Sequence, residues 1–172
     1  MATHSGMYEN IVPLNAPIDL TTTNPVQSLY LDLRTANRAS FLAYFGVVTS
    51  ATAADTMLLQ LQCSTSTTSN ATEEFIDFSY RISAATPTNT WGAVTAGTSA
   101  GVSLGASDVF DGMAVLVDVD PSIVAAKMTD ARYVRLVATP QGDGNYTAIV
   151  VSIVGIIDPR YKATTMVAAS SV

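Results

Sequence analysis

Hydrophobic and polar residues alternate along most of the chain, whereas helical spacing sustained over ten or more residues hardly appears. A period of two places successive side chains on opposite faces of a strand, so that one face meets a core and the other meets solvent. The clearest alternation spans residues 76–82, where four apolar side chains are separated by Asp77, Ser79 and Arg81. This pattern predicts an all-β protein built from half-buried strands.

Eight segments carry such strand patterns. We expect strands near residues 29–33, 41–48, 57–63, 76–82, 90–95, 113–119, 134–138 and 146–157. In the first segment, Leu29, Leu31 and Leu33 are expected to share the buried face. The segment 41–48 is apolar on both faces, which is typical of a central strand covered on both sides. About eight strands predict a two-sheet antiparallel sandwich that is jelly-roll-like, with extended N- and C-terminal arms.

Alternation within the strands also predicts which side chains form the core. We expect the following residues to be largely buried: Leu29, Leu31, Phe45, Leu59, Leu61, Phe78, Tyr80, Val115, Val117, Leu136, Ile149 and Val151. One short helix is expected after Asp120-Pro121, because an Asp oxygen caps free N–H groups and Pro fits the first helical turn. The chain of 172 residues then divides into an N-terminal arm (1–20), one β-sandwich domain (21–161) and a C-terminal tail (162–172).

Charge and hydropathy narrow the classes of partner. Charged residues make up only 13% of the chain, the net charge is −6, and the eight Lys and Arg residues are scattered singly. No basic stripe is available to neutralise phosphates, so we expect no nucleic-acid partner. The longest apolar run, 148–157, is half the ~20 residues that a membrane span requires, so it predicts a buried strand and no membrane partner.

The residues that usually carry catalysis or hold metals are few. His4 is the single histidine and lies in the predicted arm, and Cys63 is the single cysteine, in a run typical of a small buried hydrophobe. Neither has a plausible catalytic partner, so we expect no enzyme activity, no cofactor and no zinc site. Asp118 and Asp120 share one face of a strand, where a weak cation site is conceivable, but we interpret them as solvated carboxylates.

Two features are candidates for binding a partner. Trp91 could stack on a sugar, anchor an interface, or pack at the edge of a sheet. The N-terminal segment contains Tyr8, Ile11, Val12 and Leu14, which are apolar although nearby prolines prevent a regular central strand. These four side chains need a surface to cover them. We expect that surface to be a neighbouring subunit or a capsid, the alternative being that the segment folds back over its own sandwich.

A set of segments, taken in order, carries a family resemblance. The segments are 10–20, 29–46, 59–62, 75–80, 113–120, 133–136 and 156–161. Together they resemble a family of small virion proteins of tailed bacteriophages, the head decoration, cement or minor capsid proteins. The resemblance covers residues 10–161 and includes no catalytic motif, and the loops at 64–72 and 96–106 have the least family character.

The resemblance implies a function. It implies a jelly-roll-like structural protein, made in the host cytoplasm, that binds the outer capsid surface of the virion and stabilises the shell. The implied partners are the major capsid protein of the phage head and further copies of the chain itself, as a homotrimer. Two alternatives stay open at this stage, a carbohydrate-binding β-sandwich module and a tail or head-fibre component of the virion.

Overall fold

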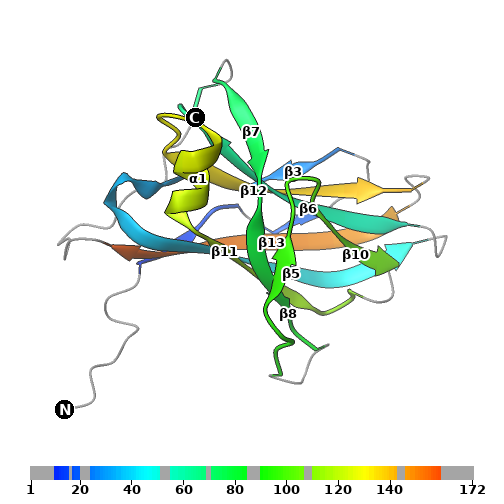
Figure 1. Ribbon diagram of the computed structural model, residues 1–172. Helices are drawn as coiled ribbons and strands as arrows, with labels where there is room; N and C mark the ends of the chain where they lie inside the picture. The colour runs from blue at the N-terminus through cyan, green and yellow to red at the C-terminus, as the bar shows by residue number, and fades with distance from the viewer. Residues whose placement is uncertain are drawn as a thin grey trace, which may run out of the picture.

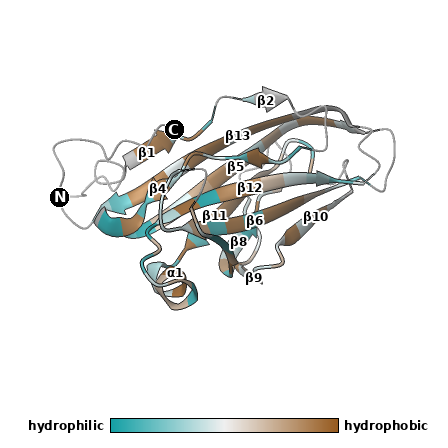
Figure 2. Cartoon of the chain, turned by 90° about the horizontal axis from the view of Figure 1, so that it is seen from above, coloured by the Kyte–Doolittle hydropathy of each residue, from teal (hydrophilic) through white to brown (hydrophobic). Residues whose placement is uncertain are grey.

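Two antiparallel β-sheets packed as a sandwich make up the protein in a computed structural model (Figure 1). The structure describes residues 10–15, 17–19, 24–50, 55–68, 71–84, 90–106, 110–142 and 146–159. Seen from above, hydrophobic segments run along β13, β6 and β10, which belong to the two sheets (Figure 2). The prediction of an all-β two-sheet sandwich is confirmed.

Strands of very different length build the two sheets. The larger sheet holds β1 (Asn10–Pro13), β2 (Ile18–Asp19), β5 (Ala36–Ser50), β8 (Phe78–Ile82), β9 (Thr95–Gly97), β11 (Ala114–Val119) and β13 (Tyr146–Pro159). The smaller sheet holds β3 (Val26–Gln27), β4 (Leu31–Asp32), β6 (Thr56–Ser64), β7 (Glu73–Ile76), β10 (Val102–Ala106) and β12 (Tyr133–Gln141). The strand expected at 90–95 is displaced to β9, and Trp91 forms only an isolated bridge with Ser83.

The long strands pair in a nested order. β5 pairs with β13, β6 pairs with β12, and β8 pairs with β11, so early strands meet late ones. Across the larger sheet the order is β1-β13-β5-β11-β8-β9, and across the smaller sheet it is β10-β6-β12-β3. This nested antiparallel pairing brings strands that are far apart in the sequence side by side in both sheets.

The core lies between the sheets and largely follows the predicted alternation. Its largest fully buried side chains are Phe41, Phe45, Phe110, Leu14, Leu31, Met57, Leu59, Leu61, Ile76, Leu136 and Ile153. Of the residues predicted to be buried, Tyr80 is only partly buried against this core, and the side chain of Ile149 lies outside the described part of the chain. Phe78, Val115, Val117 and Val151 are buried as expected.

The prediction for residues 29–33 is wrong in part. Leu29 is 37% exposed, whereas Tyr30 is only 4% exposed and Leu31 1%. Regular alternation fails because the strand is limited to β4 and a 3-10 helix follows at Leu33–Thr35. Tyr30 is instead held inside a cluster of polar side chains, so burial follows this local cluster and not the period of a strand.

The prediction that residues 41–48 are covered on both sides is also wrong. β5 is a central strand, bonded to β13 and β11, and Phe41 and Phe45 on its inner face are fully buried. On its other face Tyr44 is 42% exposed, and Val47 is 65% exposed. The apolar character of this second face therefore meets no other layer of the described chain.

The described part of the N-terminal segment pairs with the same chain. β1 pairs with β13, from Asn10 opposite Ile157 to Pro13 opposite Val154, and β2 pairs with β13 further along. β1 is the edge strand of the larger sheet, where a proline without an N–H is tolerated. The C-terminal tail predicted for 162–172 lies outside the described residues.

One α-helix occurs among the described residues. α1 (Pro121–Lys127) begins where the sequence predicts, with Asp120 as N-cap accepting a hydrogen bond of 2.8 Å from the backbone N–H of Ser122. Its buried residue is Val124, which ties the helix to the end of the sandwich. In the described part of the chain no helix has the length and apolar character needed to cross a membrane.

Candidate functional site

The solvent side of the larger sheet presents two cross-strand rows of side chains that define what we call the outer face. In one row lie Pro13, Val154, Leu42, Leu116 and Arg81. In the next row lie Ile11, Ile156, Ser40, Asp118 and Ser79. Residues directly opposite each other in an antiparallel pair share a face, so each row runs across five strands.

The outer face extends beyond these rows along β5. Tyr44 and Val47 continue it in one direction, and Arg38, paired in register with Asp158, ends it in the other. Ile11 is 60% exposed, so the exposed hydrophobic side chains stretch from the edge strand β1 to the central strand β5. A contiguous apolar surface of this kind marks an interaction site more often than a scattered exposed leucine does.

Of the charged groups of the outer face, Asp118 lies within a row, and Arg81, Arg38 and Asp158 lie at the margins. Nη2 of Arg38 lies 2.9 Å from Oδ2 of Asp118, and the Ser40 hydroxyl donates a hydrogen bond of 2.6 Å to Oδ1 of Asp118. A shallow hollow of about 240 Å³ is lined by these three residues together with Leu116, Ile156 and Asp158. Among the described residues, Arg81 and Asp158 have no ion-pair partner.

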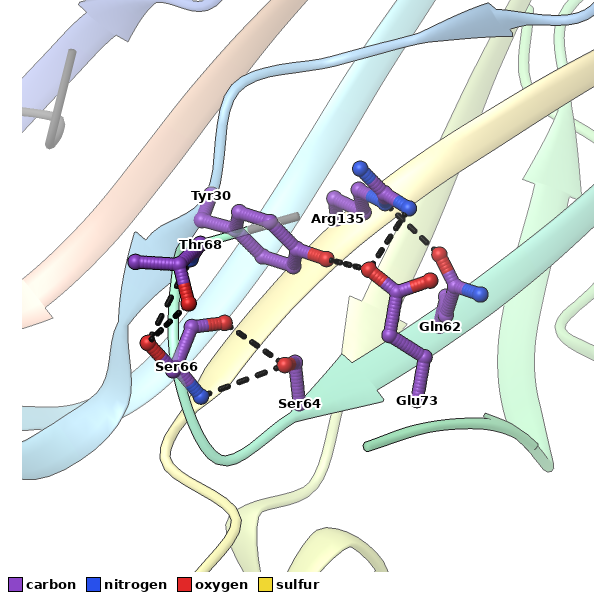
Figure 3. A network of polar contacts seen from close by, with 7 residues as sticks. All are labelled: Tyr30, Gln62, Ser64, Ser66, Thr68, Glu73 and Arg135. Atoms are coloured by element: carbon purple, nitrogen blue, oxygen red, sulfur yellow. Dashed lines mark hydrogen bonds and ion pairs between the residues drawn. The ribbon is translucent and has the colours of Figure 1, made fainter. Parts of the chain in front are cut away.

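A polar cluster lies on the smaller sheet and joins side chains from distant parts of the sequence (Figure 3). The Tyr30 hydroxyl donates to Oε1 of Glu73 on β7, and Nη2 of Arg135 on β12 donates to the same oxygen over 2.9 Å. Nε of Arg135 donates to Oε1 of Gln62 on β6 over 2.6 Å. The guanidinium of Arg135 also lies over the Tyr30 ring, 4.7 Å from its centroid, a cation–π contact.

The electrostatics of the polar cluster keep Tyr30 protonated. Burial, followed by the hydrogen bond to Glu73, raises the pKa of Tyr30 to about 12. A neutral hydroxyl that donates to a carboxylate also paired with Arg135 leaves the cluster without net charge. Such an arrangement fixes the relative position of the strands and excludes water, and it contains no activated nucleophile.

A pocket of about 390 Å³ opens beside the polar cluster. Its lining includes the polar cluster residues Tyr30, Glu73 and Arg135, and also Leu29 and Thr68. Side chains of this pocket offer hydroxyl, amide and paired charged groups to a ligand, but Tyr30 is only 4% exposed, with Arg135 over its ring and Tyr133 in an edge contact at 6.2 Å between centroids. The aromatic platform that commonly binds a sugar ring is therefore not open here.

The structure separates the four apolar residues predicted to bind a partner. Leu14 is 1% exposed and Val12 7% exposed, so both belong to the core of their own chain. The backbone N–H of Leu14 donates to the carbonyl oxygen of Ile153 over 3.0 Å, which secures the segment to β13. Ile11 points to the outer face, and Tyr8 lies outside the described residues.

Trp91 lies beyond the end of β8 and is 39% exposed. The backbone N–H of Gly92 donates to the carbonyl oxygen of Ile82 over 2.9 Å, which holds this segment against the edge of the larger sheet. Trp91 is therefore a partly exposed aromatic residue at a sheet edge, separate from the polar cluster of the smaller sheet.

The described residues that the sequence suggested for catalysis or metal binding are buried, ion-paired or used to cap a helix. Cys63 is buried on β6, and burial raises the pKa of its thiol. Asp118 is bound to Arg38 and Ser40, and Asp120 caps α1, where hydrogen bonds from Ser122 lower its pKa. His4 lies outside the described residues, within which no three His, Cys, Asp or Glu side chains could hold a metal ion together.

Sequence reasoning missed both the polar cluster and the outer face. Single charged residues such as Arg135 and Glu73 look like solvated strand positions, and only the register of β12, β6 and β7 brings them together. The signal for the outer face was present, because the segment 41–48 is apolar on both sides. Without a fold, that signal does not distinguish a strand covered by its own chain from one covered by a partner.

A scan against protein-family models and searches of curated proteins and of solved structures found no match for the chain.

Proposed function

We propose that the chain is a structural virion protein of a tailed phage. In this role it binds the outer capsid surface as a homo-oligomer, acts as a decoration or cement protein, and stabilises the shell. Its partners are the major capsid protein and further copies of itself, and it performs no catalysis. The family resemblance of residues 10–161 supplies the virion assignment, and the apolar outer face is the observation that supports a protein built to assemble.

The distribution of polarity fits this proposal. A decoration protein has to remain dispersed before it meets the shell, and a net charge of −6 limits association between free copies. Once assembled it needs apolar contact, which Ile11, Tyr44 and Val47 offer at 60%, 42% and 65% exposure. The long β5 and β13 strands, paired over most of their length, give that surface a rigid support.

Labelling of intact particles tests the proposal. Phage particles produced from the genome that encodes this chain are incubated with gold-labelled antibody against the purified protein and imaged by electron microscopy. Regular labelling of heads supports a decoration protein. Labelling confined to tails or fibres favours the tail or head-fibre alternative, and particles without label contradict a virion role.

A carbohydrate-binding module is the second candidate, and the exposed side chain of Trp91 favours it. Binding of the purified protein to an array of host-surface glycans tests this candidate. Binding that disappears in Trp91→Ala, while the circular dichroism spectrum is unchanged, would favour the module over the virion protein. Equal glycan binding by the wild type and Trp91→Ala would show that Trp91 does not bind the sugar.

A further inference from the structure

The outer face carries no net charge, although the chain as a whole carries −6. Arg38 and Arg81 contribute two positive charges, and Asp118 and Asp158 contribute two negative charges. Two acidic chains repel each other least where their meeting surfaces are neutral, and a neutral surface with separated charges of both signs can be complementary to itself. The occupant that fits this face best is therefore another copy of the same chain.

From this geometry we propose that the outer face packs against the outer face of a second copy, related by a two-fold axis that lies in the interface. The inference rests on the proposed function, since it names the surface through which the homo-oligomer forms. A two-fold contact is isologous, so each interface contains every pair of residues twice. It predicts a dimer in solution in place of the homotrimer that the family resemblance implies.

The register places Arg81 and Asp158, which have no ion-pair partner in the described part of the chain, at opposite corners of the outer face. Arg81 lies on β8 in the row of Leu42, and Asp158 lies on β13, four residues beyond Val154 of that row. With strands about 4.8 Å apart and a rise of about 3.4 Å per residue, the corners are separated by about 14 Å across the strands and about 14 Å along them. A two-fold axis along the other diagonal brings Arg81 of each copy against Asp158 of the second copy.

The same axis matches apolar residues with apolar residues. It turns the strands of one copy to about 90° from those of the other, one of the two common packings of sheets. Leu116 then lies against Ile156 of the second copy, and Tyr44 lies against Ile11. Arg38 and Asp118, which neutralise each other within one chain over 2.9 Å, come close to the axis and need no new partner.

The overlap of the two faces suits a weak, reversible dimer. From Arg38 to Val47 the outer face runs about 31 Å along β5, and from β1 to β8 it is about 19 Å wide, by the spacings of an ordinary sheet. Because the strands of the two copies cross at about 90°, the faces overlap over a square about 19 Å on a side, about 360 Å² per copy or about 720 Å² for both, which is below the roughly 1,200–2,000 Å² of stable interfaces.

Complementary charge reversals test the pairing. Arg81→Glu and Asp158→Arg are prepared separately, and sedimentation equilibrium compares each of them with the wild type and with their equimolar mixture. At high protein concentration the wild type should approach twice the 18.0 kDa of one chain. Each variant alone places like charges at both corners, so its dimer should dissociate with a Kd at least about 10-fold higher. In the mixture both Arg–acid pairs are restored, and the heterodimer should regain wild-type affinity within about 3-fold.

Matched reversals away from the outer face provide the control. Lys127→Glu on α1 and Glu74→Arg on β7 change the net charge by the same amounts at exposed positions, and both should dimerise as the wild type does. A wild type that is trimeric or stays monomeric at every concentration, or a mixture that stays monomeric where the wild type dimerises, would overturn the proposal. If the protein is monomeric in solution and the antibody labels phage heads, the interface is wrong and the virion role stands. If the protein is a dimer and the particles are not labelled, the interface stands and the virion role is wrong.

Discussion

The guanidinium of Arg135 lies over the ring of Tyr30, and both side chains donate a hydrogen bond to the same carboxylate oxygen of Glu73. Arg135→Met keeps the aliphatic bulk but leaves Glu73 without its counter-charge in a half-buried position. We expect the free energy of unfolding in urea to fall by about 1–3 kcal/mol, because a partly buried charged group loses its hydrogen bonds. Arg34→Met is the matched control, since Arg34 also pairs with a carboxylate, that of Asp32, but its side chain is 57% exposed.

The control variant should lose clearly less stability than Arg135→Met, as exposed ion pairs contribute little. Equal losses in the two variants would mean that the polar cluster adds nothing to the stability of the smaller sheet.

Tyr30 makes stability depend on pH in the alkaline range. Its pKa is raised from 10.0 to about 12, so above pH 10 the unfolded chain releases a proton that the folded chain still holds. The unfolded state then binds fewer protons, and the free energy of unfolding falls as pH rises. The contribution is complete below pH 10 and is lost as pH rises toward about 12.

Tyr30→Phe removes this titration while it keeps the ring. Urea unfolding at several pH values should show a steeper decline for the wild type than for Tyr30→Phe across the interval between the two pKa values. Parallel curves for the two proteins would contradict a Tyr30 held neutral by the fold.

Truncation of Leu29 and of Leu31, which lie two positions apart, should have very different effects on stability. Leu31 is 1% exposed and Leu29 is 37% exposed. Leu31→Ala should lower the free energy of unfolding by about 2–5 kcal/mol, the usual cost of truncating a buried leucine. Leu29→Ala should cost less than about 1 kcal/mol, as a surface substitution does. Equally large losses in the two variants, measured by urea denaturation, would restore the shared buried face that the sequence pattern predicts.

The N-terminal segment offers a second such pair. The side chain of Leu14 reaches the position where a Cβ on Gly155 would lie, at a distance of 3.0 Å, so it fills a notch in its own β13. Leu14→Ala should destabilise the isolated chain by about 2–5 kcal/mol, and Ile11→Ala should change its stability by less than about 1 kcal/mol. Sensitivity of monomer stability to Ile11 but not to Leu14 would contradict the burial of this segment.

Periodicity predicted the fold well where a strand has one face on the core. Residues 113–119 alternate as β11 does, and the cap at Asp120 began a helix as its local chemistry requires. The segment 76–82, expected as a single strand, is instead divided between the end of β7 in the smaller sheet and β8 in the larger sheet. The pattern failed around Tyr30, because its burial depends on Glu73, which is 43 positions away, and on Arg135. Contacts of that range leave no local signature in a sequence.

The candidate site was harder to predict than the fold. The sequence showed that the prolines exclude a central strand for the N-terminal segment, and β1 is indeed an edge strand. Which of its side chains face the core and which face solvent depends on the register with β13, so Val12 and Ile11 could not be separated beforehand. Arg81 and Asp158 acquire significance only through the order of strands across the sheet.

Shell reinforcement by the purified chain tests the central claim most directly. Particles assembled from a genome that lacks this chain are incubated with the purified protein, and bound protein and the temperature of genome release are measured for the same sample. The proposed function predicts saturable binding to the heads and a higher release temperature than in untreated particles. A protein that is folded yet neither binds these particles nor raises their release temperature would contradict a role as a capsid decoration protein.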